Sequence, residues 1–177
     1  MRMIDPLITE LEQEAITTRR LLERVPADKL NWRPHPKSRT LGQLAMHVAT
    51  VPGAVSEIGM MKSFEFENAP GDADPKSVKE ILSAHDASIA QAKRNFVSLD
   101  DARAMEPWTG MMGGKPVFTA PRIGLMRMIA LNHWYHHRGQ LSAFVRELNV
   151  PVPSIYGPSA DENPFLAAAE AAGAMKA

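Results

Sequence analysis

Residues 121–148 read PRIGLMRMIALNHWYHHRGQLSAFVREL, and they carry the clearest helical pattern in the chain. Apolar side chains and two histidines recur there three or four residues apart, the spacing that places side chains on one face of an α-helix. The stripe consists of Met126, Ile129, Ala130, His133, His137, Leu141, Phe144 and Leu148. The sequence therefore predicts a long amphipathic helix with two histidines on its inward face.

Three further segments repeat this spacing. They cover about residues 6–25, 40–61 and 74–99. In the second, Thr40 and Gln43 match the pattern of a capping box, in which each side chain accepts a backbone N–H of the other residue. Pro52 lies within this segment and is expected to kink or end the helix there, because proline removes a helical hydrogen bond.

The region before the last helix differs from the rest of the chain. Gly113 and Gly114 stand between two short apolar stretches, which predicts a hairpin or a tight turn over residues 108–119. The predicted fold class is therefore all-α, with four helices and one short Gly/Pro turn or hairpin. Residues 1–164 are expected to form a single domain, followed by an alanine-rich tail over residues 165–177.

Composition narrows the possible functions. The chain has 177 residues, 20 basic and 20 acidic side chains, and no cysteine. The balanced charge gives no reason to expect a nucleic-acid partner or an anionic membrane. Without cysteine, any metal must be held by nitrogen and oxygen atoms. No apolar run approaches the ~20 residues of a membrane span, so we expect a cytoplasmic protein.

The histidines are the strongest functional signal. His133 and His137 lie one helical turn apart, so both imidazoles can bind one ion. His47 lies on the predicted inward face of the second helix and would complete a three-nitrogen site. Such a site leaves a coordination position open for water or substrate. The alternative is that each of these histidines is a packed core residue.

The remaining histidines and Arg138 have several interpretations. His85 lies on an apolar face and is either a fourth ligand, a group that orients a ligand, or a buried histidine. His136 points away from the stripe and is either a surface residue or a group that orients a ligand, or else it replaces His137 in an i,i+3 pair with His133. His35 lies in a proline-rich loop and is expected to be solvated. Gln140 is a candidate to orient a histidine. Arg138 either forms a structural salt bridge or binds an anionic group or a second subunit.

Several known site types are absent from the sequence. A helical zinc protease has glutamate directly after its first histidine, whereas Trp134 follows His133 here. The Glu-x-x-His repeats of di-iron bundles are missing. The chain also lacks a Walker-type phosphate loop and the Gly-x-Ser-x-Gly nucleophile elbow of α/β-hydrolases.

Three sequence blocks resemble one known family. The run HWYHHRGQL at residues 133–141 is followed by VPVP at 150–153 and IYGPS at 155–159. Upstream, residues 40–49 read TLGQLAMHVA, with His47 in the position of a first metal-binding histidine. Together these blocks resemble the DinB family over nearly the whole chain.

The resemblance implies an up-down-down-up four-helix bundle, often a homodimer. It also implies a metal site formed by His47, His133 and His137, which would bind zinc or nickel, or else iron or manganese. Some members of the family are transferases or isomerases that use the thiols mycothiol or bacillithiol. The family is unrelated to the DNA polymerase that shares its name.

Two classes of function follow. As an enzyme, the protein would use the ion to lower the pKa of a bound thiol or water, giving thiol S-transfer to a small electrophile or, alternatively, hydrolysis. Asp161 and Glu162 are candidates for a carboxylate near the site, and no catalytic residue is assigned. As a non-catalytic protein, it would be a metal-binding or stress-response dimer. A closed fourth ligand such as His85 would favour this second class.

Overall fold

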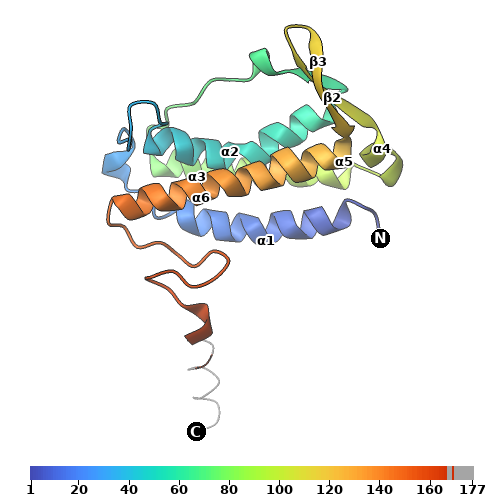
Figure 1. The fold of residues 1–177 in the computed structure, drawn as a ribbon. Helices are drawn as coiled ribbons and strands as arrows, with labels where there is room; N and C mark the ends of the chain where they lie inside the picture. The colour runs from blue at the N-terminus through green and yellow to red at the C-terminus, as the bar shows by residue number, and fades with distance from the viewer. Residues whose placement is uncertain (167–168, 170–177) are drawn as a thin grey trace.

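A computed structural model describes residues 1–166 and 169 of the chain. In this part, four long helical stretches lie side by side (Figure 1). They are α1 (Asp5–Leu22), α2 (Leu41–Met60), α3 (Val78–Val97) and a last stretch made of α5 (Arg122–Leu125), the π-helix η3 (Met126–Asn132) and α6 (His133–Glu147). Helices α2 and α3 run in one direction, and α1 and α6 run in the other (Figure 1). Most of the predicted alanine-rich tail lies outside the described residues.

The apolar faces of the four stretches meet in one core. Its fully buried members include Leu11, Leu21, Leu44, Val48, Ile81, Phe96, Met126, Leu131, Trp134 and Leu141. The short helices η1 (Ala27–Lys29), η2 (Phe66–Asn68) and α4 (Asp101–Met105) lie outside these four stretches. Across the described residues, we find no helix with the length and apolar character to span a membrane.

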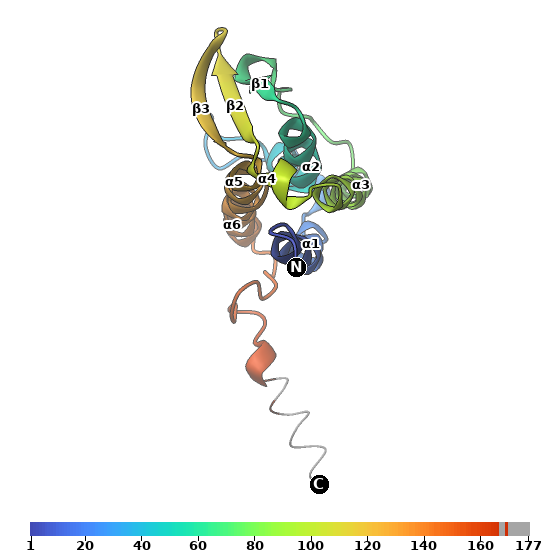
Figure 2. The same ribbon diagram turned by 90° about the vertical axis from the view of Figure 1, so that its right-hand side faces the viewer.

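A small sheet corrects the all-α prediction. Strand β1 (Ser63–Glu65) pairs in parallel with β2 (Pro107–Met112), which pairs antiparallel with β3 (Lys115–Pro121). The predicted hairpin is confirmed as β2 and β3, and Gly113 and Gly114 make its turn with positive φ angles of 57° and 72°. Strand β1 was not predicted. The sheet stands over one end of α2 and α5, on the side away from α1 (Figure 2).

Local side-chain hydrogen bonds set where two helices begin. The Gln43 N–H donates to Thr40 Oγ1 at 3.1 Å and the Thr40 N–H donates to Gln43 Oε1 at 2.9 Å, so the predicted capping box is confirmed. The third helix was expected to open at Asp74–Pro75, and this is wrong. It begins at Val78, because Ser77 accepts the Glu80 N–H at 3.2 Å and caps the helix there.

Pro52 lies inside α2 without ending the helix. Proline cannot donate a hydrogen bond to the carbonyl four residues earlier, which belongs to Val48. The Trp134 indole N–H donates to that carbonyl instead, at 2.8 Å. On α3, the Ser88 hydroxyl donates to the Thr50 carbonyl at 3.1 Å and accepts the Gly53 N–H at 2.8 Å. Neighbouring helices thus bind the groups that Pro52 leaves unpaired, and α2 continues to Met60.

Substitution of Gly53 by alanine is expected to destabilise the protein. An added Cβ would lie 2.9 Å from the backbone Cα and carbonyl oxygen of Ser88, so α2 and α3 would have to separate. We expect a loss of about 1–3 kcal/mol in the free energy of unfolding, measured by urea denaturation. Gly139→Ala is the control, because a Cβ on Gly139 meets no atom within 4 Å. It should raise stability by about 0.5–1 kcal/mol, and equal effects of the two substitutions would contradict the argument.

Candidate metal centre

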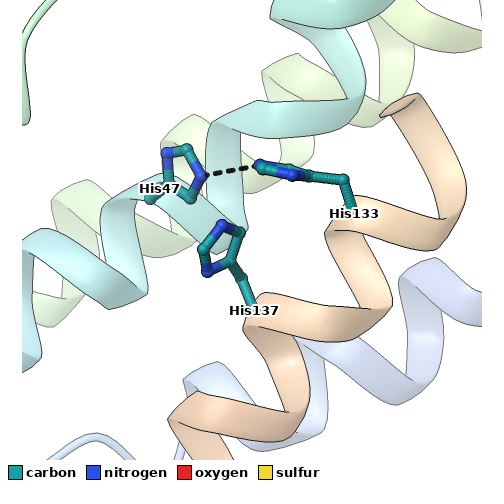
Figure 3. Close-up of side chains that lie close together, drawn as sticks. All are labelled: His47, His133 and His137. Atoms are coloured by element: carbon teal, nitrogen blue, oxygen red, sulfur yellow. Dashed lines mark hydrogen bonds between the residues drawn. The ribbon is translucent and has the colours of Figure 1, made fainter. Parts of the chain in front are cut away.

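Three histidines from two helices face one another. His133 and His137 lie on consecutive turns of α6, and His47 faces them from α2 (Figure 3). The Nε2 atoms of His47 and His133 are 3.2 Å apart. The ring centroid of His137 lies 4.4 Å from the ring centroid of His47 and 4.4 Å from that of His133. One possible ligand atom from each of the three residues lies within 4.8 Å of the others, so this group could hold a metal ion.

The π-helix η3 immediately precedes His133 and ends at Asn132. A π-helix has a wider turn than an α-helix, and such segments often occur next to functional sites. Here η3 joins the end of the sheet, through α5, to the first turn of α6. The rotation of α6 that turns His133 and His137 toward α2 therefore depends on this segment.

The spacing of the nitrogens suits one ion. Two nitrogens held 2.0–2.1 Å from a zinc ion at the tetrahedral angle lie about 3.3 Å apart. The His47–His133 distance of 3.2 Å is close to this value. Within residues 1–166 and 169, no aspartate, glutamate or further histidine joins the three. An ion held here would thus have three imidazole ligands from the described residues, and a tetrahedral ion would keep one position for a small ligand.

The three imidazoles are held in the uncharged form that binds metals. Burial is the main reason that the pKa of His47 and the pKa of His133 are lowered to about 4, and the Arg39 guanidinium adds to the effect. Burial likewise lowers the pKa of His137. A protonated imidazole has no lone pair to offer, so these lowered pKa values favour metal binding near neutral pH.

Gln140 orients the ring of His137. The His137 Nδ1 atom lies 2.7 Å from Gln140 Oε1, which can only accept a hydrogen bond. The amide nitrogen of Gln140 in turn donates to His136 Nε2 at 3.1 Å. With Nδ1–H fixed as the donor, the lone pair of His137 lies on Nε2, which points toward His47 (Figure 3). Gln140 thus fills the orienting role for which it was a candidate.

An open chamber of about 490 Å³ lies in front of His47 and His133, and we call it the histidine chamber. Its polar side chains are Arg39, Gln43, Thr50 and Asp72. The Arg39 Nε atom pairs with Asp72 Oδ1 at 2.7 Å, which ties residues 69–73 over this part of α2. Because the chamber is open on one side, a small molecule can reach His47 and His133 from solvent.

His85 lies apart from this group. It is only 2% exposed, its Nδ1 atom lies 3.4 Å from Asp86 Oδ1, and its ring centroid lies 6.4 Å from that of Trp134. His85 is therefore a buried histidine and does not join the three-histidine group as a fourth ligand. His136 and His35 are exposed, as the sequence predicted.

Arg138 forms the predicted structural salt bridge. Its side chain is 1% exposed, and Nη1 lies 2.5 Å from Glu14 Oε2 on α1. The same nitrogen donates to Thr18 Oγ1 at 3.1 Å. The rings of Tyr135 and Tyr156 lie 5.1 and 5.0 Å from the guanidinium carbon, within the range of cation–π attraction. Arg138 thus fastens α6 to α1.

The two carboxylates proposed near the site lie elsewhere. Glu162 binds Arg20 on α1 at 2.5 Å and accepts the Ser154 N–H at 2.7 Å. Asp161 pairs with Arg146 on α6 and accepts the Val152 N–H at 2.9 Å. These contacts hold the segment after α6 against α1 and α6, so the expectation of a carboxylate beside the histidines is not met.

Sequence reasoning missed the surroundings of the histidines. Arg39 and Asp72 come from two loops whose meeting no helical spacing could indicate. Phe64 and Phe66, on β1 and η2, line a second cavity next to His133. The alternation of Phe64, Glu65 and Phe66 was the available signal for a strand, but three residues are too short for a clear pattern.

Comparison with known proteins identifies a family and a similar bacterial protein. The model of the DinB family matches residues 3–164. The uncharacterised protein YrdA of Bacillus subtilis (strain 168) is 26% identical over 160 residues, which is 90% of this chain and 91% of that protein.

Solved structures share the fold. A DinB-like protein of Bacillus cereus ATCC 10987 superposes with a TM-score of 0.61 at 25% identity, over 84% of this chain and 94% of that one. The DinB-like protein YjoA of Bacillus subtilis gives 0.64 at 15% identity, over 83% and 96% of the two chains. A putative DinB family member of Exiguobacterium sibiricum 255-15 gives 0.59 at 18% identity, over 91% and 98%.

Proposed function

Since the chain belongs to the DinB family, we propose that it binds one divalent metal ion through His47, His133 and His137 and catalyses thiol S-transfer to a small electrophile. The observation that carries the proposal is the group of three neutral imidazoles with no fourth protein ligand among the described residues. A closed set of four ligands is typical of structural zinc, whereas three ligands and an open position are typical of catalytic zinc.

The ion, when bound, would supply a positive charge that lowers the pKa of a thiol or a water molecule at the open position. The residues of the chain provide the rest. The three imidazoles fix the position of the ion, Gln140 fixes the ring of His137, and the histidine chamber admits the thiol and the electrophile. In the transfer, a sulfur–carbon bond forms as the bond from carbon to the leaving group breaks, and the thiol proton passes to solvent.

Thiol transfer can be tested with a defined pair of reactants. Protein loaded with zinc or with nickel would be incubated with bacillithiol or mycothiol and monochlorobimane, and the S-conjugate measured by mass spectrometry. We expect conjugate to form faster with loaded protein than with protein stripped by a chelator, and the His47→Ala variant to match the stripped protein. A bound ion without any acceleration would refute the transferase and support the non-catalytic alternative.

Gln140→Leu is expected to weaken metal binding without unfolding the protein. The leucine removes the acceptor that fixes His137 Nδ1–H, so the ring is free to rotate. Loss of such an orienting partner typically costs about 10–100-fold in metal affinity. The affinity for zinc would be measured by competition with a chelating dye. Gln140→Glu keeps an acceptor oxygen in place and should retain most of the affinity, so equal losses in both variants would argue against the orienting role.

A further inference from the structure

A second cavity lies on the other side of His133, and we call it the aromatic cavity. It has a volume of about 380 Å³ and lies between the sheet, the end of α2 and η3. Its walls are apolar: they include Phe64, Phe66, Trp108, Phe118, Met128 and Ile129. For comparison, an apolar cavity of about 150 Å³ holds one benzene molecule. The aromatic cavity therefore has room for a group of two fused rings or a branched alkyl chain.

The aromatic walls are built by specific packing. The Trp108 side chain is fully buried, and its indole N–H donates to the Ile58 carbonyl at 3.1 Å. The ring of Phe66 lies across Gly110, where an added Cβ would come within 2.7 Å of the ring. Glycine at this position thus lets Phe66 approach Trp108, with ring centroids 6.3 Å apart. Yet Phe66 is 40% exposed and Met128 is 44% exposed, so these apolar walls are incompletely covered.

The aromatic cavity and the histidine chamber share part of their lining. Val55, Ala69 and His133 line both. His133 is the single side chain with a titratable group among the residues that line the aromatic cavity. The histidine chamber, by contrast, carries the charged side chains of Arg39 and Asp72. A candidate metal ligand thus stands at the boundary between an apolar space and a polar one.

This division selects a class of substrate. A charged or strongly hydrogen-bonding group loses its water against the aromatic walls without gaining a partner there, because the Trp108 N–H is already bonded and His133 lies only at the boundary with the histidine chamber. An aryl or branched alkyl group gains from the same transfer, and aromatic walls favour it further through edge-to-face contacts. The polar part of the same molecule would be accommodated in the histidine chamber.

We propose that the electrophile is a small amphipathic molecule whose aryl or branched alkyl group lies in the aromatic cavity and whose reacting carbon lies beside His133. This inference rests on the proposed thiol transfer for the reaction, but not for the binding of the apolar group. The sulfur–carbon bond would form, and the leaving group depart, at the junction of the two cavities.

The test uses binding first and reaction second. The inert probe 2-naphthalenemethanol would be titrated calorimetrically into wild type and two variants, each with and without zinc. Phe118→Trp adds volume inside the aromatic cavity, whereas Val117→Trp adds the same side chain at the neighbouring position, which is 56% exposed. We expect Phe118→Trp to weaken binding about tenfold or more and Val117→Trp to leave it unchanged. Ala69→Phe, in an exposed loop, provides a second filling variant should Phe118→Trp fold poorly.

The two proposals fail in different ways. Absence of probe binding, or equal binding by the two tryptophan variants and Ala69→Phe, would overturn the inference whatever the thiol-transfer assay shows. Probe binding that depends on the aromatic cavity, without transfer to any electrophile, would overturn the proposed reaction and leave the apolar site standing. If both hold, the preference for 2-(bromomethyl)naphthalene over bromoethane, measured as a ratio of kcat/KM values, should fall in Phe118→Trp and persist in Val117→Trp.

Discussion

Replacing His47 with alanine is expected to abolish stoichiometric metal binding. The wild-type protein, purified without a histidine tag, should carry about one equivalent of a divalent ion by elemental mass spectrometry. His47 supplies the ligand from α2, whereas the other two come from α6. Its loss leaves two imidazoles on one helix, and we expect the affinity for zinc to fall about a thousandfold, more than the loss of an orienting partner costs.

His35→Ala is the matched control for this experiment. It removes an exposed histidine from the loop before α2 and should leave the metal content unchanged. His137→Ala should behave like His47→Ala, because both nitrogens belong to the same group. A wild-type protein that cannot be loaded with any of zinc, nickel, iron or manganese would show that the three histidines are packing residues.

Removal of Glu14 is expected to cause a large loss of stability. Arg138 is 1% exposed, and Glu14, itself 15% exposed, is its carboxylate partner. Glu14→Ala leaves the guanidinium buried without an opposite charge, a change that typically costs about 3–5 kcal/mol. Urea denaturation of the metal-free protein would measure the effect without any contribution from bound ion.

Two further variants separate charge burial from general damage to α1. Glu12→Ala breaks an exposed pair with Lys93, in which both side chains are about half exposed, and should cost about 1 kcal/mol or less. The double variant Glu14→Leu, Arg138→Leu removes both charges and should be more stable than Glu14→Ala alone. A Glu14→Ala variant as stable as Glu12→Ala would show that Arg138 is not held by this pair.

The sequence predicted the helices well because their apolar spacing is long and regular. It also predicted the capping box at Thr40, which depends on two residues three apart. The same regularity placed His133 and His137 on one face, and the structure brings His47 to them. These features are local, or depend on a helix packing its apolar face inward, and both kinds of information are present in a single sequence.

The features that the sequence did not reveal depend on distant partners. Pro52 remains helical because Trp134 and Ser88, which lie 36 or more positions away, supply its missing hydrogen bonds. Strand β1 exists because β2 pairs with it, more than forty residues later. The aromatic cavity arises only when that pairing brings Phe66 next to Trp108. No pattern within a short window contains these contacts.

The π-helix before His133 has a consequence for how the protein can change by insertion or deletion. Each residue added to or removed from a helix rotates all that follows by about 100°. Residues 126–132 connect α5, which directly follows strand β3 of the sheet, to the two histidines of α6. A single deletion there would turn both imidazoles away from His47 unless the sheet moved as well. The number of residues between Leu125 and His133 is therefore itself a constraint, independent of which amino acids occupy those positions.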